Sequence, residues 1–452
     1  MAINFPERFK ARMRAQLGAE WDQFEFAHHL PSPVSIRINP SKGITPTNSD
    51  GQVDWARNGV YLKERPVFTL DPLFHAGCYY VQEASSMFLE QALTQHVPPD
   101  RPLRVLDLCA APGGKSTHLL SLLNDESLLV SNEVIRSRVN VLSENIQKWG
   151  YHNAVVTNND PADFSSLEGF FDLIVLDAPC SGEGLFRKDP KAMEEWSEEN
   201  VQICSQRQQR IIADVWPSLK EGGILIYSTC TYDPSEDENI LAWIRDTFDV
   251  EFRPIDARAW AVSEIKNEKI SACRFYPHKV RGEGFFISVI KKKESQPSMT
   301  IKPSKSAFVH AEKRIAAEVN AWLLRSDETL IRRDDLLQLL PARHSSEIHF
   351  LTQRLRVIYA GTFVASVKHN KLVPEHSLAL SRLMRKEVFI QTRLDEKEAL
   401  QYLKKETIAV RSNQKGFSLA TFNDVPLGWM NLLGGRINNM YPQEWRIRMQ
   451  IK

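Results

Sequence analysis

The stretch LRVLDLCAAPGGKSTHL, residues 103–119, decides the fold of this chain. Its first six residues have the pattern of a short buried strand, a turn of small residues follows, and a helical pattern begins near residue 115. A strand, a small-residue turn and a helix in this order bring backbone N–H groups and a helix N-terminus against a polar or anionic ligand. The stretch therefore predicts a nucleotide-like ligand at the start of an α/β domain.

The alternation of strands and helices continues along the chain. Helical patterns occupy 136–149 and 200–219, and apolar runs predict further strands at 128–133, 154–160, 171–179 and 222–230. Strands that alternate with helices form a mostly parallel, doubly wound sheet, which binds ligands at the carboxyl ends of its strands. We therefore expect an α/β, Rossmann-like core with its site residues at that edge.

Composition shifts divide the chain into regions. Pro98, Pro99 and Pro102 end an N-terminal extension of α+β character (1–97), and the core follows at 98–293. Residues 294–306, rich in Lys, Ser and Pro, are predicted to be a linker. Beyond it we expect a first C-terminal domain (307–380) and a small β-rich domain (381–452), with helix at 308–340 and strands at 354–373.

The charge of the chain is divided between its two ends. Residues 300–452 carry 25 Lys and Arg against 15 Asp and Glu, a net charge of +10, in a chain whose overall charge is +1. A basic tail on a mildly acidic body is typical of a polyanion-binding module attached to a catalytic domain, and a solvated basic surface explains the same count. The tail residues that could stack bases or hold phosphates are Trp429, Arg436, Tyr441, Trp445, Arg446 and Arg448, although buried tryptophans and tyrosines are the commoner alternative.

Other function classes find little support in the composition. No apolar run approaches the ~18 residues that a membrane span needs, and the first residues lack the pattern of a signal peptide. We therefore expect a cytoplasmic protein without a membrane partner, most simply a monomer. The six cysteines include no CxxC pair, which argues against a zinc site and for reduced thiols.

The loop at 109–115 admits three interpretations. GGKST resembles the end of a P-loop, but Cys109 stands where the first glycine should be and would crowd a phosphate. The dinucleotide-binding pattern of three glycines is absent as well. In a methyltransferase, the loop would instead surround the methionine part of a cofactor, and Glu133, about twenty residues further on, would bind ribose hydroxyls. Asp160 ends the next strand, where the adenine would lie, although either acid could merely cap the turn that follows it.

Two cysteines and an acid lie at neighbouring strand ends. Asp177 ends one predicted strand, Cys180 follows in the same loop, and Cys230 ends the next strand. Methylation of cytosine at C5 needs a thiolate that adds to C6, a group that holds N3, and removal of the C5 proton. Each cysteine alone is more simply a core residue, but together they predict an active site. The spacing does not rank Cys180 against Cys230, and Cys78, Cys109, Cys204 and Cys273 are expected to pack.

Taken together, the motifs of this chain resemble the NOL1/NOP2/Sun family of RNA cytosine-C5 methyltransferases. The matching segments are SIRINP (35–40), YVQEASSM (80–87), DLCAAPGGKST (107–117), NEVIRSRVNVLSEN (132–145), DAPCSGEGLFRKDP (177–190), STCTY (228–232) and RFYPHKVRGEGFF (274–286). The end segment PLGWMNLLGGRINNMYPQEWRI (426–447) is similar to the PUA-like tail of the family's bacterial RsmF-type branch. The resemblance implies a class I methyltransferase core that uses S-adenosylmethionine and acts on ribosomal RNA, free or in a subunit. It also implies an RNA-binding extension at 1–97 and a PUA-like RNA-binding domain at 381–452.

The resemblance also implies roles for individual residues. Cys230 is implied as the nucleophile, Cys180 as the group that assists release of the methylated RNA, and Asp177 as a contact of both the base and the cofactor. The other implied cofactor contacts are Cys109, Ala110, Ala111, Pro112, Gly113, Gly114, Lys115, Glu133 and Asp160. Transfer RNA as the substrate, a noncatalytic RNA-binding scaffold and a P-loop-like NTPase remain as alternatives.

Overall fold

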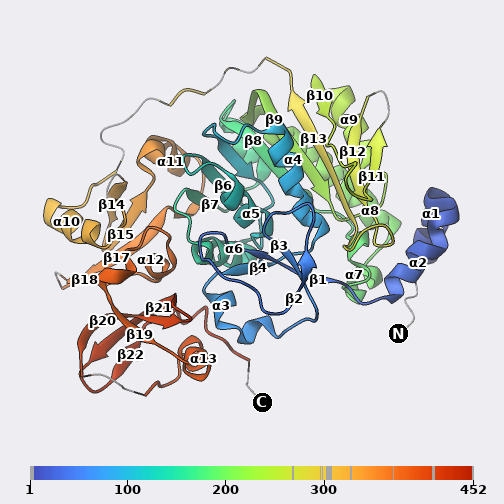
Figure 1. Ribbon diagram of the computed structural model, residues 1–452. Helices are drawn as coiled ribbons and strands as arrows, with labels where there is room; N and C mark the ends of the chain where they lie inside the picture. The colour runs from blue at the N-terminus through green and yellow to red at the C-terminus, as the bar shows by residue number, and fades with distance from the viewer. Residues whose placement is uncertain are drawn as a thin grey trace.

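The computed structural model describes residues 5–266, 269–295, 297, 299–301, 308–325, 328–369, 371–409 and 413–449. Its centre is a large twisted sheet with helices on both sides, and the C-terminal region lies against one end of it (Figure 1). Most of the predicted linker falls outside the described residues, so that prediction stays open.

Among the described residues, ten strands form the central sheet. Nine follow the order β11-β12-β13-β9-β8-β5-β6-β7-β16, and β10 pairs with β13. The five middle strands are parallel and are the five that the sequence predicts for the core: β5 (Arg104–Asp107), β6 (Leu128–Asn132), β7 (Ala154–Thr157), β8 (Phe171–Asp177) and β9 (Leu219–Thr229). The antiparallel additions on the β9 side are β10 (Val250–Arg253), β11 (Ser263–Lys266), β12 (Ser271–Phe275) and β13 (Phe285–Lys292).

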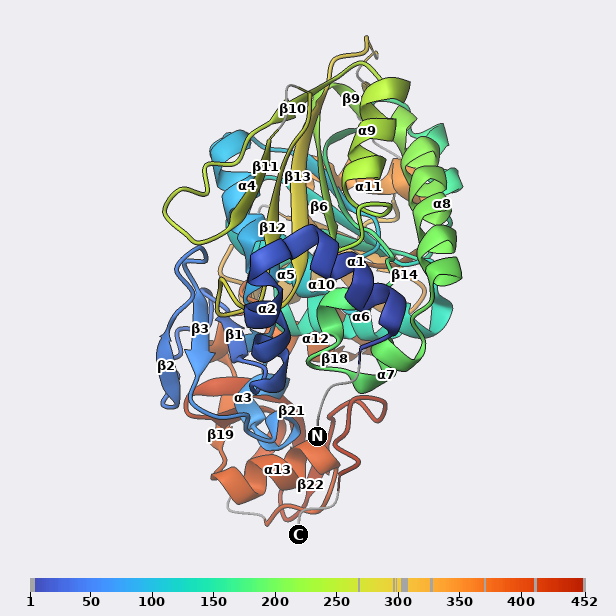
Figure 2. The ribbon, with the colours of Figure 1, turned by 90° about the vertical axis from the view of Figure 1, so that its right-hand side faces the viewer.

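Successive residues of the parallel strands point to opposite faces of the sheet and bury two separate cores. Val105 packs on one face with helices α4 (Leu89–His96), α5 (Gly114–Leu122) and α6 (Arg136–Trp149). Leu106 packs on the other with α8 (Glu198–Val215), α9 (Glu238–Thr247) and α11 (Ser345–Thr352). Figure 2 shows α4 on one side of the sheet and α8 and α9 on the other. The doubly wound α/β core is thereby confirmed.

The N-terminal extension combines helices with a small sheet. It begins with α1 (Glu7–Leu17) and α2 (Trp21–His29) and continues into an antiparallel sheet of the order β2-β3-β1-β4, with a short helix α3 before β4. The bounds are β1 Val34–Ile38, β2 Ser49–Gln52, β3 Gly59–Leu62, α3 Pro72–His75 and β4 Tyr79–Val81. The extension is therefore of the α+β kind expected.

The short helix α7 (Pro190–Glu194) lies in the core, just after the loop that contains Cys180.

The C-terminal region differs from the prediction in its first half. Residues 308–340 contain one helix, α10 (Lys313–Ala321), and then a hairpin of β14 (Thr329–Arg333) and β15 (Leu336–Leu340), so the predicted continuous helix is wrong. Asp334 adopts a positive φ of 55° in the turn, which breaks a helix, and the leucines of the second strand then pair across the hairpin.

Two further sheets and an edge strand complete the C-terminal region. The first sheet adds β17 (Thr362–Lys368) and β18 (Lys371–Pro374) to the hairpin, and α12 (His376–Leu380) follows. The last sheet contains β19 (Ile390–Arg393), β20 (Lys415–Phe422), β21 (Val425–Leu433) and β22 (Ile437–Asn439), with α13 (Glu396–Lys404) inserted. Strand β16 (Val357–Ala360) pairs with β7 of the central sheet. The segment 307–380 therefore does not stand apart from the core.

Partly buried hydrogen bonds join the extension, the core and the C-terminal region. The Lys42 ammonium group donates to the carbonyl oxygens of Ala76 at 2.6 Å, Lys148 at 3.0 Å and Leu380 at 3.0 Å, one from each part of the molecule. Beside it, Ile36 and Tyr79 of the extension share an apolar cluster with Tyr402 of the last domain. The three parts are thus packed as one body.

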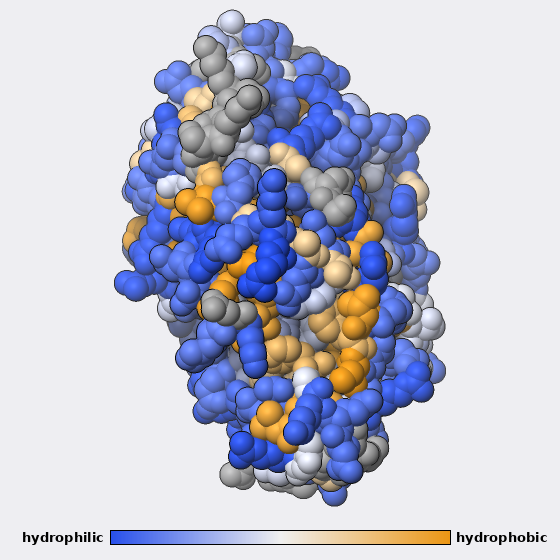
Figure 3. All heavy atoms as spheres, turned by 90° about the vertical axis from the view of Figure 1, so that its left-hand side faces the viewer, coloured by the Kyte–Doolittle hydropathy of each residue, from blue (hydrophilic) through white to orange (hydrophobic). Residues whose placement is uncertain are grey.

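The outer surface of the C-terminal region is largely hydrophilic. Figure 3 faces this side and shows hydrophobic residues gathered in a band across its lower half. Among the described residues of this region, the exposed large apolar side chains are Val309, Leu324, Val388, Leu433 and Met449. Within the described residues, none of the helices has the length and apolar character that crossing a membrane requires.

Candidate active site

Two thiols meet at the carboxyl ends of neighbouring strands. β8 and β9 are parallel, and Asp177 at the end of β8 pairs in register with Ser228 of β9. The loop after β8 carries Cys180, and Cys230 follows the last residue of β9 directly. The two Sγ atoms lie 3.3 Å apart without a covalent bond. The predicted meeting of Asp177, Cys180 and Cys230 is therefore observed.

The thiol of Cys180 is held in its protonated form. Its hydrogen bond with Cys230, together with burial, raises the pKa of Cys180 well above the ordinary value. The backbone N–H of Cys230 also donates to Cys180 Sγ, at 3.4 Å. At neutral pH Cys180 is accordingly a thiol that shares a hydrogen bond with the sulfur of Cys230, and the two cysteines have unequal environments.

Asp177 is linked to the predicted cofactor loop. Lys115 Nζ lies 2.8 Å from one carboxylate oxygen, and the Ser228 hydroxyl donates to the other at 2.9 Å. The Lys115 ammonium group also lies 5.2 Å from the centre of the Phe285 ring. One lysine therefore connects the start of α5, the end of β8 and strand β13.

The loop before α5 has the form of a ligand cradle. Gly113, with a φ of 111°, begins the helix without a side-chain cap, so N–H groups of the first turn have no side-chain acceptor there. Asp107 lies beneath, fully buried; Ser116 donates to one of its oxygens at 2.6 Å, and the other has no partner among the described residues. Burial raises the pKa of Asp107 to about 7. An uncapped helix start and an unpaired buried oxygen fit a polar ligand.

The two predicted ribose and adenine contacts have local partners. Glu133 is buried; one oxygen accepts from the backbone N–H of Ile135 at 2.8 Å, and the other lies 3.4 Å from Arg138 Nη1. Asp160 accepts from the N–H of Ala162 at 3.1 Å and lies 3.4 Å from Arg210. Both acids make the capping bonds that the alternative interpretation expects. Both also follow parallel neighbours, β6 and β7, at the edge that carries the thiols.

The remaining cysteines lie outside this cluster. Cys78 and Cys273 are buried in apolar cores. Cys109 packs beside the core of the α8 face, and burial raises the pKa of its thiol. Cys204 is half-buried on α8, and burial raises its pKa as well. High thiol pKa values suit packing residues and not nucleophiles.

Several residues that the sequence did not single out hold the Cys180 loop. The Glu236 carboxylate accepts from the backbone N–H of Ser181 at 2.8 Å and from its hydroxyl at 2.5 Å. Gln208 donates to the carbonyl oxygen of Pro179 at 3.0 Å. Two glycines allow a close approach of the neighbouring segments, because a Cβ on Gly184 would lie 2.9 Å from the carbonyl oxygen of Cys230, and one on Gly284 would lie 2.7 Å from the Cα of Gly184.

A buried arginine of the extension supports the cofactor loop. Arg37 donates to the Thr117 hydroxyl at 2.6 Å, to the Gly114 carbonyl oxygen at 3.2 Å and to the Gln82 side chain at 2.8 Å. Its guanidinium group stacks on Trp149 of α6, 4.6 Å from the ring centre. Arg37 lies in SIRINP and Gln82 in YVQEASSM, so these motifs fix the start of α5 against the extension.

The buried carboxylate of Glu236 makes stability depend on pH. Burial raises the pKa of Glu236 from 4.5 to about 7. In the unfolded chain the Glu236 carboxyl group loses its proton near pH 4.5, whereas in the folded chain it keeps the proton up to about pH 7. The contribution of Glu236 to the free energy of unfolding is therefore complete below pH 4.5 and is lost as the pH rises through 7.

Replacing Glu236→Gln removes this titration and can keep the bonds to Ser181. Relative to the wild type, the free energy of unfolding of the variant is expected to be higher at pH 8 than at pH 5 by roughly 2 to 3 kcal/mol. Urea unfolding at both pH values measures the difference. Parallel pH dependence of the two proteins would contradict the raised pKa.

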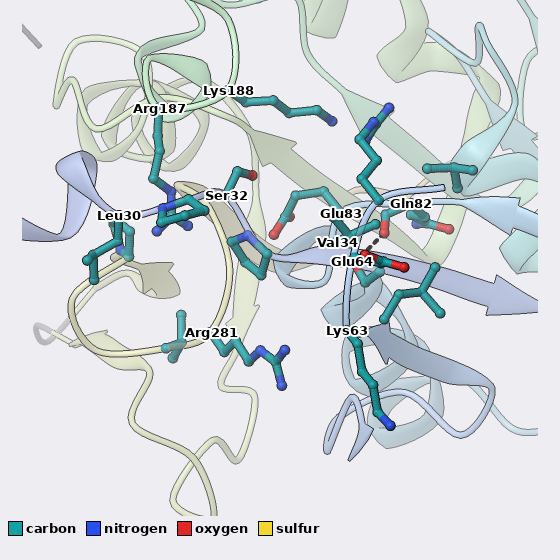
Figure 4. Close-up of a pocket in the computed structure, with 18 residues that line it drawn as sticks. Leu30, Ser32, Val34, Lys63, Glu64, Gln82, Glu83, Arg187, Lys188 and Arg281 are labelled. Carbon is teal, nitrogen blue, oxygen red and sulfur yellow. Dashed lines mark hydrogen bonds between the residues drawn. The ribbon is translucent and has the colours of Figure 1, made fainter. Parts of the chain in front are cut away.

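A groove of about 830 Å³ lies between the extension and the core, next to these loops (Figure 4). Arg187 and Lys188 line it from the segment after Cys180, Arg281 lines it from the segment before Gly284, and Lys63 and Arg65 line it from the extension. Arg187 pairs with the buried Glu283, whereas the side chains of Lys63, Arg65 and Lys188 have no ion-pair partner among the residues that the structure describes. Figure 4 shows Lys188 extending across the groove from the core side.

Comparisons with known proteins agree with this geometry. Residues 94–291 match the family model described as 16S rRNA methyltransferase RsmB/F, residues 5–84 match the N-terminal domain of 16S rRNA methyltransferase RsmF, and residues 389–447 match the methyltransferase RsmF PUA domain. The core match spans the cofactor loop and both thiols. No P-loop family is needed to explain the GGKST segment.

Curated relatives match over almost the whole chain. A ribosomal RNA small subunit methyltransferase F of Salmonella schwarzengrund is 32% identical, over 98% of this chain and 97% of its own length. The protein of the same description from Shewanella loihica is 31% identical, over 93% and 91%.

Solved structures support the fold of the core. A methyltransferase homolog protein from Pyrococcus horikoshii is 29% identical and covers 64% of this chain and 96% of its own, with a TM-score of 0.55. NSun6 of the same organism is 20% identical, covers 65% and 100%, and has a TM-score of 0.54, a likeness of fold alone. The class I methyltransferase core and the PUA-type end predicted from the sequence are thus confirmed, and the chain belongs to the RsmB/F family of 16S rRNA methyltransferases.

Proposed function

We propose that this protein transfers the methyl group of S-adenosylmethionine to C5 of a cytosine in small-subunit ribosomal RNA. The observation that carries the proposal is the pair of thiols 3.3 Å apart, beside Asp177, at the strand ends next to an uncapped helix start. A methyltransferase that acts on oxygen or on an exocyclic nitrogen needs no thiol. Addition to C6 of a pyrimidine does need one.

Cys230 is the nucleophile in this proposal. Its sulfur adds to cytosine C6, which makes C5 electron-rich; after C5 is methylated, a base removes the C5 proton and the bond between sulfur and C6 breaks. Asp177, fixed by Lys115 and Ser228, would hold the base at N3 during the addition. The target cytosine must be unpaired or flipped out of its stack to meet these groups.

Cys180 is suited to assist the release of the product. Its raised pKa keeps it protonated, so it is a poor nucleophile but a hydrogen donor to the sulfur of Cys230. A donor at this place stabilises the thiolate of Cys230 before the addition and when it leaves C6. Its protonated state favours Cys230 over Cys180 as the nucleophile.

The cofactor would occupy the cradle beneath α5 and supply the methyl group. Residues 109–115 would surround its methionine part at the helix N-terminus, Glu133 would accept hydrogen bonds from ribose hydroxyls, and Asp160 would lie beside the adenine. One oxygen of Glu133 accepts from the N–H of Ile135, and the other makes a loose contact with Arg138 at 3.4 Å. The carboxylate therefore retains the capacity to accept further hydrogen bonds. Arg37 would keep the start of α5 in place through Thr117 and Gly114.

We place the RNA strand that flanks the target cytosine in the groove beside the thiol loops. Lys63, Arg65 and Lys188, which have no ion-pair partner in the described part of the chain, can neutralise phosphates, and the core wall of the groove belongs to the segment that carries Cys180. The predicted base-stacking roles of Trp429 and Tyr441 are not supported, because both side chains are buried in the last domain. Arg436 and Arg448 are exposed there and remain available for phosphates.

Reversing two charges of the groove is expected to weaken RNA binding. The double variant Lys63→Glu, Lys188→Glu should lose roughly tenfold or more in affinity for RNA. The plot of log affinity against log salt concentration should become less steep by about 1.4, because two phosphate contacts are lost. Filter binding over a salt series measures both quantities.

Lys293→Glu is the matched control for this experiment. Lys293 follows β13, which runs antiparallel to β9, and therefore lies at the opposite edge of the sheet from Cys230. S-adenosylmethionine binding should be unchanged in both variants. An unaltered salt slope in the double variant would exclude the groove as the RNA path.

The reaction itself is tested with purified protein, methyl-labelled S-adenosylmethionine and small-subunit ribosomal RNA, offered free and as assembled subunits. Mass spectrometry of the nucleosides should find the label in 5-methylcytidine. Label in another nucleoside would reject the proposed atom, and label in transfer RNA alone would reject the substrate. RNA binding without any label would favour the noncatalytic scaffold.

A further inference from the structure

We propose that Arg12 is a positioning residue that fixes the separation of the two thiol-bearing loops. This inference rests on the proposed function, since it takes Cys180 and Cys230 as the reacting pair. Arg12 lies on α1, at the start of the extension and far from both cysteines in sequence. Its guanidinium group bridges one carboxylate from each thiol loop.

The bridge consists of two ion pairs. Arg12 Nη2 lies 2.6 Å from Glu183, three residues after Cys180, and Nη1 pairs with Asp233, three residues after Cys230. A guanidinium group is planar and presents its N–H donors in a fixed fork, so the two carboxylates cannot separate without breaking one pair. Arg12 is therefore a spacer between the loops, and not only an anchor for α1.

Glu183 is built to hold this position. Its side chain has 0% exposure, and its carboxylate also accepts from the Trp196 indole N–H at 2.8 Å and from the backbone N–H of Tyr232 at 3.2 Å. Burial raises the pKa of Glu183, and Arg12 acts in the opposite direction. A buried carboxylate that loses its only cation among the described residues moves or takes up a proton, because an uncompensated buried charge is strongly unfavourable.

Movement of either carboxylate reaches a thiol through short connections. The N–H of Gly184, next to Glu183, donates to the carbonyl oxygen of Cys230 at 2.8 Å. Asp233 accepts from the N–H of Ser235 at 2.8 Å, which folds the loop after Cys230 back on itself. The two loops also touch where Gly184 meets the carbonyl oxygen of Cys230, and Gly284 closes the other side, with no room for a Cβ on Gly184. A shift of about an ångström at Glu183 or Asp233 would therefore alter the distance between the two sulfurs.

The same helix offers a matched control. Phe9 and Met13 of α1 are buried against Phe186 and Tyr232, which lie in the two segments that follow the cysteines. Met13→Ala weakens the packing of α1 and leaves the guanidinium bridge intact. If α1 mattered only as a structural support, Met13→Ala and a loss of the Arg12 charge would have the same consequences.

The experiment compares Arg12→Met, Arg12→Lys and Met13→Ala in the full chain. Arg12→Met keeps an apolar side chain of similar reach and removes the charge. We expect it to lower kcat by 10- to 100-fold, because misplacement by about an ångström costs up to about 100-fold, with the KM for S-adenosylmethionine within twofold of the wild type. Arg12→Lys should restore part of kcat, and Met13→Ala should lower the unfolding temperature with kcat close to that of the wild type.

A second readout does not depend on methylation. The rates at which iodoacetamide alkylates Cys230 and Cys180, followed by peptide mass spectrometry with Cys204 as the internal reference, should change at least threefold in Arg12→Met. Unchanged alkylation with a wild-type kcat would overturn the inference, as would equal losses of kcat in Arg12→Met and Met13→Ala. If the wild type methylates no cytosine, the proposed function fails, and the alkylation rates still decide whether Arg12 positions the thiols.

Discussion

Replacing Cys230→Ala is expected to lower methyl transfer by roughly 10⁴-fold or more, because the variant lacks the group that must add to C6 before C5 can react. The cavity left by one sulfur is small, and Cys230 is only half-buried, so the fold should survive. Transfer of labelled methyl groups to RNA in single-turnover experiments measures the loss. Unchanged binding of S-adenosylmethionine and of RNA shows that the defect is chemical.

Cys180→Ala is the matched comparison, since it removes the neighbouring sulfur 3.3 Å away. This variant keeps the nucleophile and loses the donor that assists its departure. It should therefore accumulate a covalent complex of protein and RNA, visible as a band of reduced mobility in denaturing gels. A covalent complex formed by Cys230→Ala and absent from Cys180→Ala would reverse the two assignments.

Replacing Lys42→Met is expected to lower the free energy of unfolding by about 3 kcal/mol. The ammonium group donates to three carbonyl oxygens, on Ala76, Lys148 and Leu380, and burial lowers its pKa to about 8. A hydrogen bond to a charged group contributes about 1.5 to 3 kcal/mol, and the cost of burying the charge offsets part of this sum. The carbonyl groups left behind would be unsatisfied at the junction of all three regions.

Urea unfolding monitored by circular dichroism measures this change. Lys63→Met serves as the control, because Lys63 is exposed and makes no ion pair among the residues described, and its loss should stay within about 0.5 kcal/mol. Equal stabilities of the two variants would mean that the three regions do not depend on the Lys42 bonds.

The central sheet and the meeting of the thiols were predictable from the sequence for a shared reason. Parallel strands of similar length end at one edge, so residues that follow successive strands come together without knowledge of any tertiary contact. Asp177 and Ser228 pair in register, and Cys180 and Cys230 follow within three residues of those positions. The spacing does not rank the two cysteines; the family resemblance implies the ranking, and the raised pKa of Cys180 supports it.

The residues that position the site were not predictable in this way. Arg12 contacts Glu183 across 171 positions, and Arg37 contacts Thr117 across 80. A long-range ion pair leaves no periodicity or local motif in either partner. Arg37 lies in SIRINP, and its role there depends on the packing of the extension against α5.

The C-terminal region shows how apolar patterns mislead. The leucines of 336–340 fit a helix in isolation, but the turn at Asp334 sets them into a hairpin against β14. Likewise, Trp429 lies in the basic tail, where an exposed aromatic side chain would suit RNA, yet it is 1% exposed and its indole N–H donates to the carbonyl oxygen of Glu375. Trp429 is buried because it lies on β21, within the last sheet of the chain.

The most direct test is bisulfite sequencing of ribosomal and transfer RNA from cells that lack this protein, complemented with the wild type or with Cys230→Ala. The proposed function predicts that one or more cytosine signals in small-subunit ribosomal RNA disappear in the deletion, return with the wild type and do not return with Cys230→Ala. If no cytosine in any of these RNAs changes, the assignment to cytosine C5 is contradicted.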